Sequence, residues 1–149
     1  MYSSIVVGTD GSPTAAKAVQ RAAELAAATG AVLHVVGGVR LPSRSMAVAP
    51  EGAYAVAQAS GEWDAESVAS VQQMLDRLAA QFPGITTKTH AVPEAAVEAL
   101  LGVAGREGAG LIVVGSRGMT GLGRVKGSVP NSVAHKAICD VLIVYTTGE

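Results

Sequence analysis

The sequence predicts a three-layer α/β fold: a doubly wound, five-stranded parallel sheet of the Rossmann-like, flavodoxin-like type, with strand order 3-2-1-4-5. Short apolar runs alternate along the 149 residues with longer segments whose apolar residues recur every three or four positions. Two glycine-rich turns, at residues 8–12 and 115–128, each follow an apolar run and precede a helical segment. This alternation favours right-handed crossovers that place helices on both faces of the sheet. We expect a single domain over residues 1–149.

The first strand, helix and strand are predicted within residues 5–36. Residues 5–7 are a β-branched run that ends in the turn GTDGSP. Ser12 is a typical N-cap, Pro13 is favoured in the first helical turn, and Gly30 closes the helix. A second strand follows at residues 31–36, which are apolar apart from one histidine.

The middle of the chain begins with residues 37–61, which are rich in glycine, proline, serine and alanine and show little periodicity. They predict a long excursion, either a lid or a disordered segment. Helical spacing returns over residues 62–81 and ends before Pro83-Gly84, and a strand is expected at residues 85–92.

The last part of the chain contains two further strands and two helices. Pro93 is expected to open a helix that continues through Ala104, followed by a buried strand at residues 111–114. A helix is predicted from near Ser128 to about Ala137. Residues 141–145 are predicted to form the final strand, at one edge of the sheet.

Composition excludes several classes of partner and location. Eleven Lys and Arg against twelve Asp and Glu give a net charge of -1, which supplies no global field for nucleic acid or an anionic membrane. No apolar run approaches the roughly eighteen residues of a membrane span, and the start of the chain does not resemble a signal peptide. The single cysteine, Cys139, cannot form an intrachain disulfide. We therefore expect a cytoplasmic protein with neither nucleic acid nor membrane as partner.

The two glycine turns are expected to meet, because strands one and four flank the crevice of a 3-2-1-4-5 sheet. In GSRG at residues 115–118 and in Gly127-Ser128, glycines let backbone N–H groups approach an anion, and Ser128 adds a hydroxyl at a helix N-terminus. Arg117, Arg124 and Lys126 supply countercharge. A phosphate site and a merely flexible loop both remain open, whereas the Walker A and Rossmann patterns are absent.

Other polar residues carry weaker signals. Asp10 suits either a ribose hydroxyl or an Asx turn that caps the following helix, and the sequence favours neither. His34, His90 and His135 lie in no spaced metal motif, so we interpret them as structural and predict no metal site. Cys139 is interpreted as buried or inert, and no nucleophile elbow is present. We assign no catalytic residue.

Four segments together resemble the universal stress protein family over essentially the whole chain: IVVGTDGS at 5–12, LIVVGSRG at 111–118, GSV at 127–129 and CDVLIV at 139–144. The resemblance implies a five-stranded parallel sheet and, in the nucleotide-binding branch of the family, bound ATP. Mg²⁺ is a companion ion to consider if the ligand is ATP. Val35 would offer its backbone to the adenine. The implied nucleotide-binding residues are Gly8, Thr9, Asp10, Val35, Val114, Gly115, Ser116, Arg117, Gly118, Gly127, Ser128 and Val129.

Two features make cyclic AMP the alternative ligand. Residues 119–126 are one residue shorter than is usual in the family's ATP-binding pattern, and a cyclic nucleotide needs fewer phosphate contacts. SVPNSV at 128–133 and VYTT at 144–147 also resemble actinobacterial members that bind cyclic AMP. The leading functional hypothesis is an adenine-nucleotide-binding regulatory or stress-response module. The alternatives are a slow ATPase and a protein-interaction module that has lost its ligand site.

The final strand also predicts how the protein assembles. An apolar edge strand at residues 141–145 has unpaired N–H and C=O groups that can pair with the same strand of a second subunit. The family resemblance implies the same kind of dimer. We therefore expect a homodimer through this strand.

Overall fold

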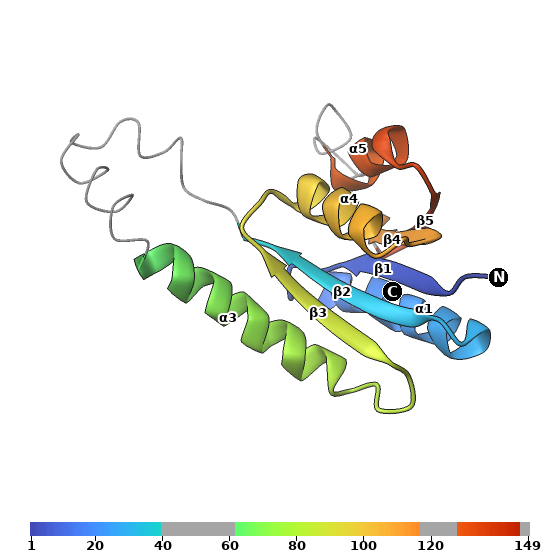
Figure 1. The fold of residues 1–149 in the computed structure, drawn as a ribbon, viewed down its shortest axis with the longest axis horizontal. Helices are drawn as coiled ribbons and strands as arrows, with labels where there is room; N and C mark the ends of the chain where they lie inside the picture. The colour runs from blue at the N-terminus through green and yellow to red at the C-terminus, as the bar shows by residue number, and fades with distance from the viewer. Residues whose placement is uncertain (40–61, 117–127, 147–149) are drawn as a thin grey trace.

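The computed structural model describes residues 1–39, 62–116 and 128–146, and its five strands form one parallel sheet in the order β3-β2-β1-β4-β5 (Figure 1). This arrangement confirms the predicted fold class. The strands are β1 (Ser4–Gly8), β2 (Val32–Gly38), β3 (Thr87–Val92), β4 (Leu111–Gly115) and β5 (Asp140–Val144). The helices are α1 (Pro13–Thr29), α3 (Glu62–Ala79), α4 (Ala96–Arg106) and α5 (Val129–Lys136).

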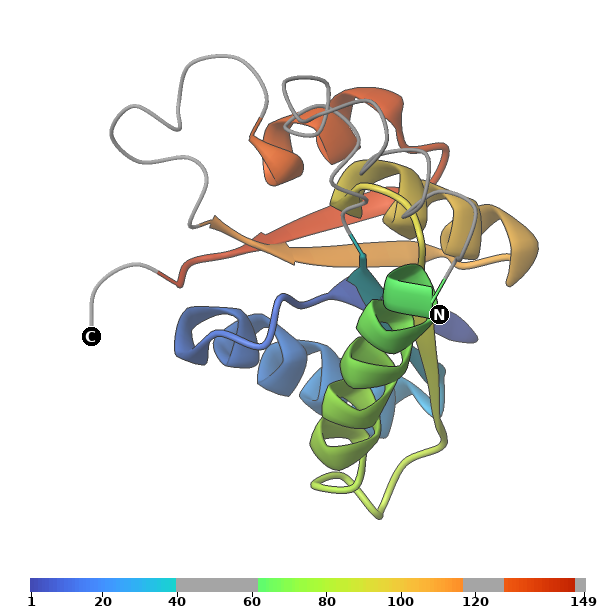
Figure 2. The ribbon, with the colours of Figure 1, turned by 90° about the vertical axis from the view of Figure 1, so that its left-hand side faces the viewer.

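Helices cover both faces of the sheet, α1 and α3 on one side and α4 and α5 on the other (Figures 1 and 2). Successive strand residues point to opposite faces. Ile5 and Val7 accordingly belong to the core with α1, whereas Val6 belongs to the core with α4. Burial on both faces explains why β1 and β4 are continuous apolar runs without polar alternation.

The ends of α1 are formed by the residues that the sequence indicates. The Ser12 hydroxyl accepts a hydrogen bond from the Ala15 N–H at 3.2 Å, which satisfies one of the unpaired donors of the first turn. Gly30 ends the helix with φ at 73°, a left-handed conformation that favours glycine. Ser128 caps α5 in the same way, accepting from the Asn131 N–H at 3.4 Å.

The start of α4 differs from the prediction. The helix begins at Ala96, not at Pro93, because the chain first makes a tight turn in which the Glu94 N–H donates to the Val92 carbonyl at 2.8 Å. The same carbonyl accepts from the Val39 N–H at 2.7 Å, which joins the end of β2 to this turn. Pro93 therefore lies in the connection between β3 and α4.

The strand β2 extends through Gly37 and Gly38, which the sequence had suggested were the start of the long excursion. A Cβ atom on Gly38 would lie 2.7 Å from the Glu94 carbonyl oxygen, so glycine is needed for this close backbone approach. The remainder of the excursion, residues 40–61, lies outside the described residues. Of the helices in the described part of the chain, none combines the length and apolar character needed to cross a bilayer.

Candidate functional site

A cavity of about 400 Å³ opens at the carboxyl ends of the neighbouring strands β1 and β4. Its volume lies within the usual range of small-molecule sites, roughly 300 to 1,000 Å³. The structure brings together six of the residues that the family resemblance implies. These residues are Gly8, Thr9, Asp10, Val114, Gly115 and Val129.

Much of the cavity wall is apolar. Val36 from β2, Leu100 from α4 and Pro130 from α5 contribute to it beside Val114. Gly8 lies against Leu100, and a Cβ on Gly8 would be 3.0 Å from the Leu100 Cδ2 atom. The absence of a side chain at Gly8 therefore allows α4 to pack closely while the space above the strand end stays open. Apolar lining of this kind is typical of sites for small organic molecules.

The turn after β1 forms the polar wall. The Thr9 N–H donates to the Val36 carbonyl at 3.0 Å, and the Thr9 hydroxyl accepts from the Gly11 N–H at 3.1 Å. The Asp10 carboxylate accepts from the Ser12 N–H at 2.9 Å, which is the Asx turn that the sequence left open. Asp10 also lines the cavity, so the turn that caps α1 holds a carboxylate at the site.

Three other implied residues are described but do not line the cavity. The Val35 side chain is fully buried in the core on the α1 side of the sheet, whereas its neighbour Val36 lines the cavity. The contact implied for Val35 is through its backbone and stays a prediction. The Ser116 hydroxyl is buried and accepts from the Thr146 N–H at 3.0 Å. Ser128 caps α5, next to the lining residue Val129. Arg117, Gly118 and Gly127 lie outside the described residues.

Thr146 lines the cavity and was not among the residues expected there. It is 1 % exposed, and its Oγ1 atom has no hydrogen-bond partner among the described residues. Its Cγ2 methyl lies 3.0 Å from where a Cβ on Gly115 would be, so the glycine leaves room for the threonine. A buried hydroxyl without a partner is costly, and a bound ligand would supply one. The signal for Thr146 in the sequence is the VYTT segment at 144–147, which resembles actinobacterial members of the family that bind cyclic AMP.

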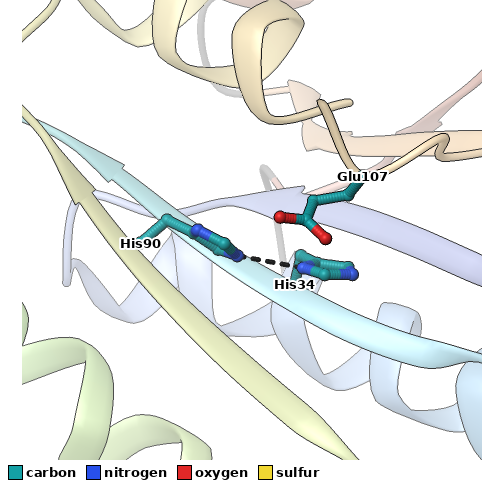
Figure 3. A group of neighbouring side chains, drawn as sticks. All are labelled: His34, His90 and Glu107. Carbon is teal, nitrogen blue, oxygen red and sulfur yellow. Dashed lines mark hydrogen bonds between the residues drawn. The ribbon is translucent and has the colours of Figure 1, made fainter. Parts of the chain in front are cut away.

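A second polar group lies on the face of the sheet covered by α4. His34 Nδ1 and His90 Nε2 are hydrogen-bonded at 2.9 Å, and Glu107 lies beside them (Figure 3). Burial lowers the pKa of both imidazoles, and each ring therefore favours its neutral form. The sequence interpretation treated these histidines as separate structural residues. Burial also raises the pKa of the half-buried Cys139 thiol, which keeps it protonated and weakly reactive.

The fold and the cavity define a doubly wound α/β protein with a small-molecule crevice where the connections of the sheet reverse. The model of the universal stress protein family matches residues 1–145. The chain belongs to this family.

The relatives are of similar length. A universal stress protein of Mycobacterium tuberculosis is 32% identical over 98% of both chains. A crystal structure of a universal stress protein in complex with cAMP is 33% identical, covers 98% of both chains and has a TM-score of 0.69. A family member from Burkholderia pseudomallei is 29% identical, covers 96% of both chains and has a TM-score of 0.69.

Proposed function

We propose that the protein binds an adenine nucleotide in the cavity at the ends of β1 and β4. The observation that carries the proposal is the combination, in one cavity, of a largely apolar wall and a buried hydroxyl on Thr146 that has no partner among the described residues. The apolar wall suits the adenine ring, and the Thr9-Asp10 turn offers oxygen atoms to ribose hydroxyls. The family relationship supports the same class of ligand.

ATP is the first candidate. The resemblance to the nucleotide-binding branch of the family implies that Arg117, Gly118 and Gly127 surround the phosphates together with Ser128. Three cations between residues 116 and 127 would balance the charge of a triphosphate, with Mg²⁺ as a companion ion. Among the described residues that line the cavity, Asp10 carries the one charged side chain, so an ATP site depends on that segment for its countercharge.

Cyclic AMP is the second candidate, and a specific observation favours it. The relative whose crystal structure contains cAMP is 33% identical over nearly the whole chain. Residues 119–126 are also one residue fewer than is usual for ATP-binding members. A cyclic monophosphate carries a single negative charge and needs fewer contacts from these residues.

We propose a regulatory, stress-responsive role for the bound nucleotide, with ATP hydrolysis slow or absent. Phosphoryl transfer needs a metal and a group that positions the attacking water. Asp10 is the one carboxylate among the described lining residues, and it already accepts a hydrogen bond from the Ser12 N–H. Multiple-turnover hydrolysis on the order of one per second would instead establish the ATPase alternative.

Ligand identification is the direct test. The protein is purified, denatured, and its released small molecules are identified by mass spectrometry; ATP, ADP and cyclic AMP are then titrated into nucleotide-free protein by calorimetry, with GTP as the control. We expect one adenine nucleotide to bind per chain and GTP to bind more weakly. Failure of every adenine nucleotide to bind would overturn the proposal and leave the protein-interaction alternative.

We also propose that the protein is a homodimer joined through β5. The apolar residues 141–144 are only half-buried, and Tyr145 and Ile138 at the two ends are 76% and 95% exposed. The opposite edge strand, β3, packs against α3 of the same chain, where the Gln72 side chain accepts a hydrogen bond from the Ala91 N–H at 3.3 Å. Edge-to-edge pairing of two β5 strands would bury this apolar surface.

We propose in addition that the protein is cytoplasmic, a location in which a lone thiol such as Cys139 stays reduced.

A further inference from the structure

Three potential metal ligands meet on the α4 face of the sheet, supplied by three elements far apart in the sequence. His90 on β3 is paired in register with Val36, so it lies diagonally across from His34 on β2 and on the same face. Glu107 is the C-cap residue of α4. Figure 3 shows the Glu107 carboxylate extending from the end of that helix toward both imidazole rings.

The three side chains are close enough to share one ion. One ligand atom from each lies within 4.8 Å of the others. Among the side chains that the structure describes, in residues 1–39, 65–116 and 128–146, no other group of three His, Cys, Asp or Glu meets this condition. His34 is buried, whereas His90 and Glu107 are partly exposed, which leaves a path for an ion from solvent. Two imidazoles and a carboxylate are a ligand set that zinc uses when its fourth position is taken by water.

We propose that His34, His90 and Glu107 bind a zinc ion, with water as the fourth ligand. This site is separate from the nucleotide cavity, because none of its three residues lines that cavity. The ion would join β2, β3 and the end of α4, and would therefore stabilise the folded chain.

The geometry needs only small changes to accept the ion. Zinc–nitrogen bonds of about 2.0 to 2.1 Å in a tetrahedron place two ligand nitrogens about 3.3 Å apart. The present separation of His34 Nδ1 and His90 Nε2 is 2.9 Å, so the rings must separate slightly. Glu107 must approach, which its flexible side chain allows. The proton of the His34–His90 hydrogen bond moves to the other nitrogen of its ring, so two neutral imidazoles bind zinc without net proton release.

The charges around the site both help and oppose metal binding. Zinc binds imidazole nitrogens in their neutral form. Glu107 supplies one negative charge. Lys88 on β3 and Arg106 on α4 act on the imidazoles as opposing positive charges. We therefore expect weaker zinc binding than in a closed site with four protein ligands.

The test uses the full chain after treatment with a chelator and its removal. Zinc is titrated by calorimetry, and Co²⁺ is used in parallel because its visible absorption reports tetrahedral coordination. Thermal unfolding is measured with and without zinc. We expect one zinc ion per chain, a tetrahedral cobalt spectrum and a higher melting temperature with metal.

Matched variants assign the ligands. Glu107→Gln and His90→Asn should each weaken zinc binding at least tenfold, since loss of even an indirect partner of a ligand typically costs 10- to 100-fold. Glu98→Gln on the exposed surface of α4 and His135→Asn on α5 are the controls and should bind zinc as the unmodified chain does. Cys139→Ser should also bind normally. Absence of stoichiometric zinc binding, or equal binding by Glu107→Gln and the unmodified protein, would overturn the site. Glu107 is a half-buried cap, so that variant tests the proposal even if His90→Asn does not fold.

Discussion

At the scale of single residues, Thr146 and Ser4 can be compared because they share one feature. Their hydroxyl oxygens are the two buried side-chain polar atoms that have no hydrogen-bond partner in the described part of the chain. Thr146 lines the cavity, whereas Ser4 begins β1 at the opposite end of the strand. An unpartnered buried hydroxyl lowers stability unless something else compensates. We propose that the Thr146 hydroxyl contacts the bound ligand.

Thr146→Val should separate ligand binding from stability. Valine has nearly the same shape, so removal of the unpartnered hydroxyl should raise the free energy of unfolding by about 1 kcal/mol. Loss of one hydrogen bond to the nucleotide should weaken its binding by roughly three- to tenfold. Calorimetry and urea unfolding measure the two effects. Ser4→Ala, the control, should leave nucleotide affinity unchanged. Unaltered affinity in folded Thr146→Val would argue against a contact between this hydroxyl and the ligand.

At the scale of elements, Gly30 in α1 and Gly105 in α4 have different backbone conformations. Gly30 ends α1 in a left-handed conformation, with open space around its missing side chain. Gly105 lies within the last turn of α4, also with open space around it. A substitution at either position therefore changes the backbone energy and little else. Substitutions at the two positions together test the backbone conformation at the C-terminal ends of α1 and α4.

Alanine at these two glycines should have opposite effects on stability. Gly30→Ala should lower the free energy of unfolding by about 1 kcal/mol, because alanine is strained at positive φ. Gly105→Ala should raise it by about 0.5 to 1 kcal/mol, because alanine favours the helix. In thermal unfolding these changes correspond to roughly 2 to 4 °C for Gly30→Ala and roughly 1 to 4 °C for Gly105→Ala. A stabilised Gly30→Ala protein would show that α1 does not end in the left-handed conformation.

At the scale of the whole molecule, the two edges of the sheet differ. The outer side of β3 packs against α3, where Gln72 and Asp76 are both hydrogen-bonded to Thr89. β5 has half-buried apolar residues instead, with Ile143 on the α4 and α5 side and Leu142 on the α1 side. The β5 edge is therefore the one at which we place the subunit contact.

Ile143→Lys should convert the proposed dimer to a monomer. The free-energy cost of burying an unpaired ammonium group at the junction would exceed the free energy gained when the two edge strands pair. Analytical ultracentrifugation at micromolar concentration measures the change. Thr87→Lys, on the half-buried edge strand β3, is the matched control and should remain dimeric. A monomeric unmodified protein would contradict the proposed assembly outright.

Most of the helices and strands, and their order, can be predicted from the amino-acid sequence. Apolar runs, N-cap serines and Gly30 act over a few neighbouring residues, so β1, α1, β4 and α5 could be predicted from local patterns. The alternation of strands and helices then favours a parallel sheet. The strand order predicted for that sheet places a crevice at the ends of β1 and β4. The glycine turns thereby led to Gly8 and Gly115, which do line the cavity.

Tertiary structure alone decided which side chains meet. β2 is buried on both faces, and the residues around His34 are apolar, so the sequence does not reveal whether the side chain of Val35 or of Val36 faces the cavity. The register of the strands decides this. His34 and His90 are 56 residues apart, and Thr146 reaches the cavity only because β5 pairs with β4. Such contacts leave no local pattern, because they arise from the pairing of distant segments. Local sequence patterns therefore predict which helices and strands form and in what order. Which side chains meet in a site depends on how those helices and strands pack against one another.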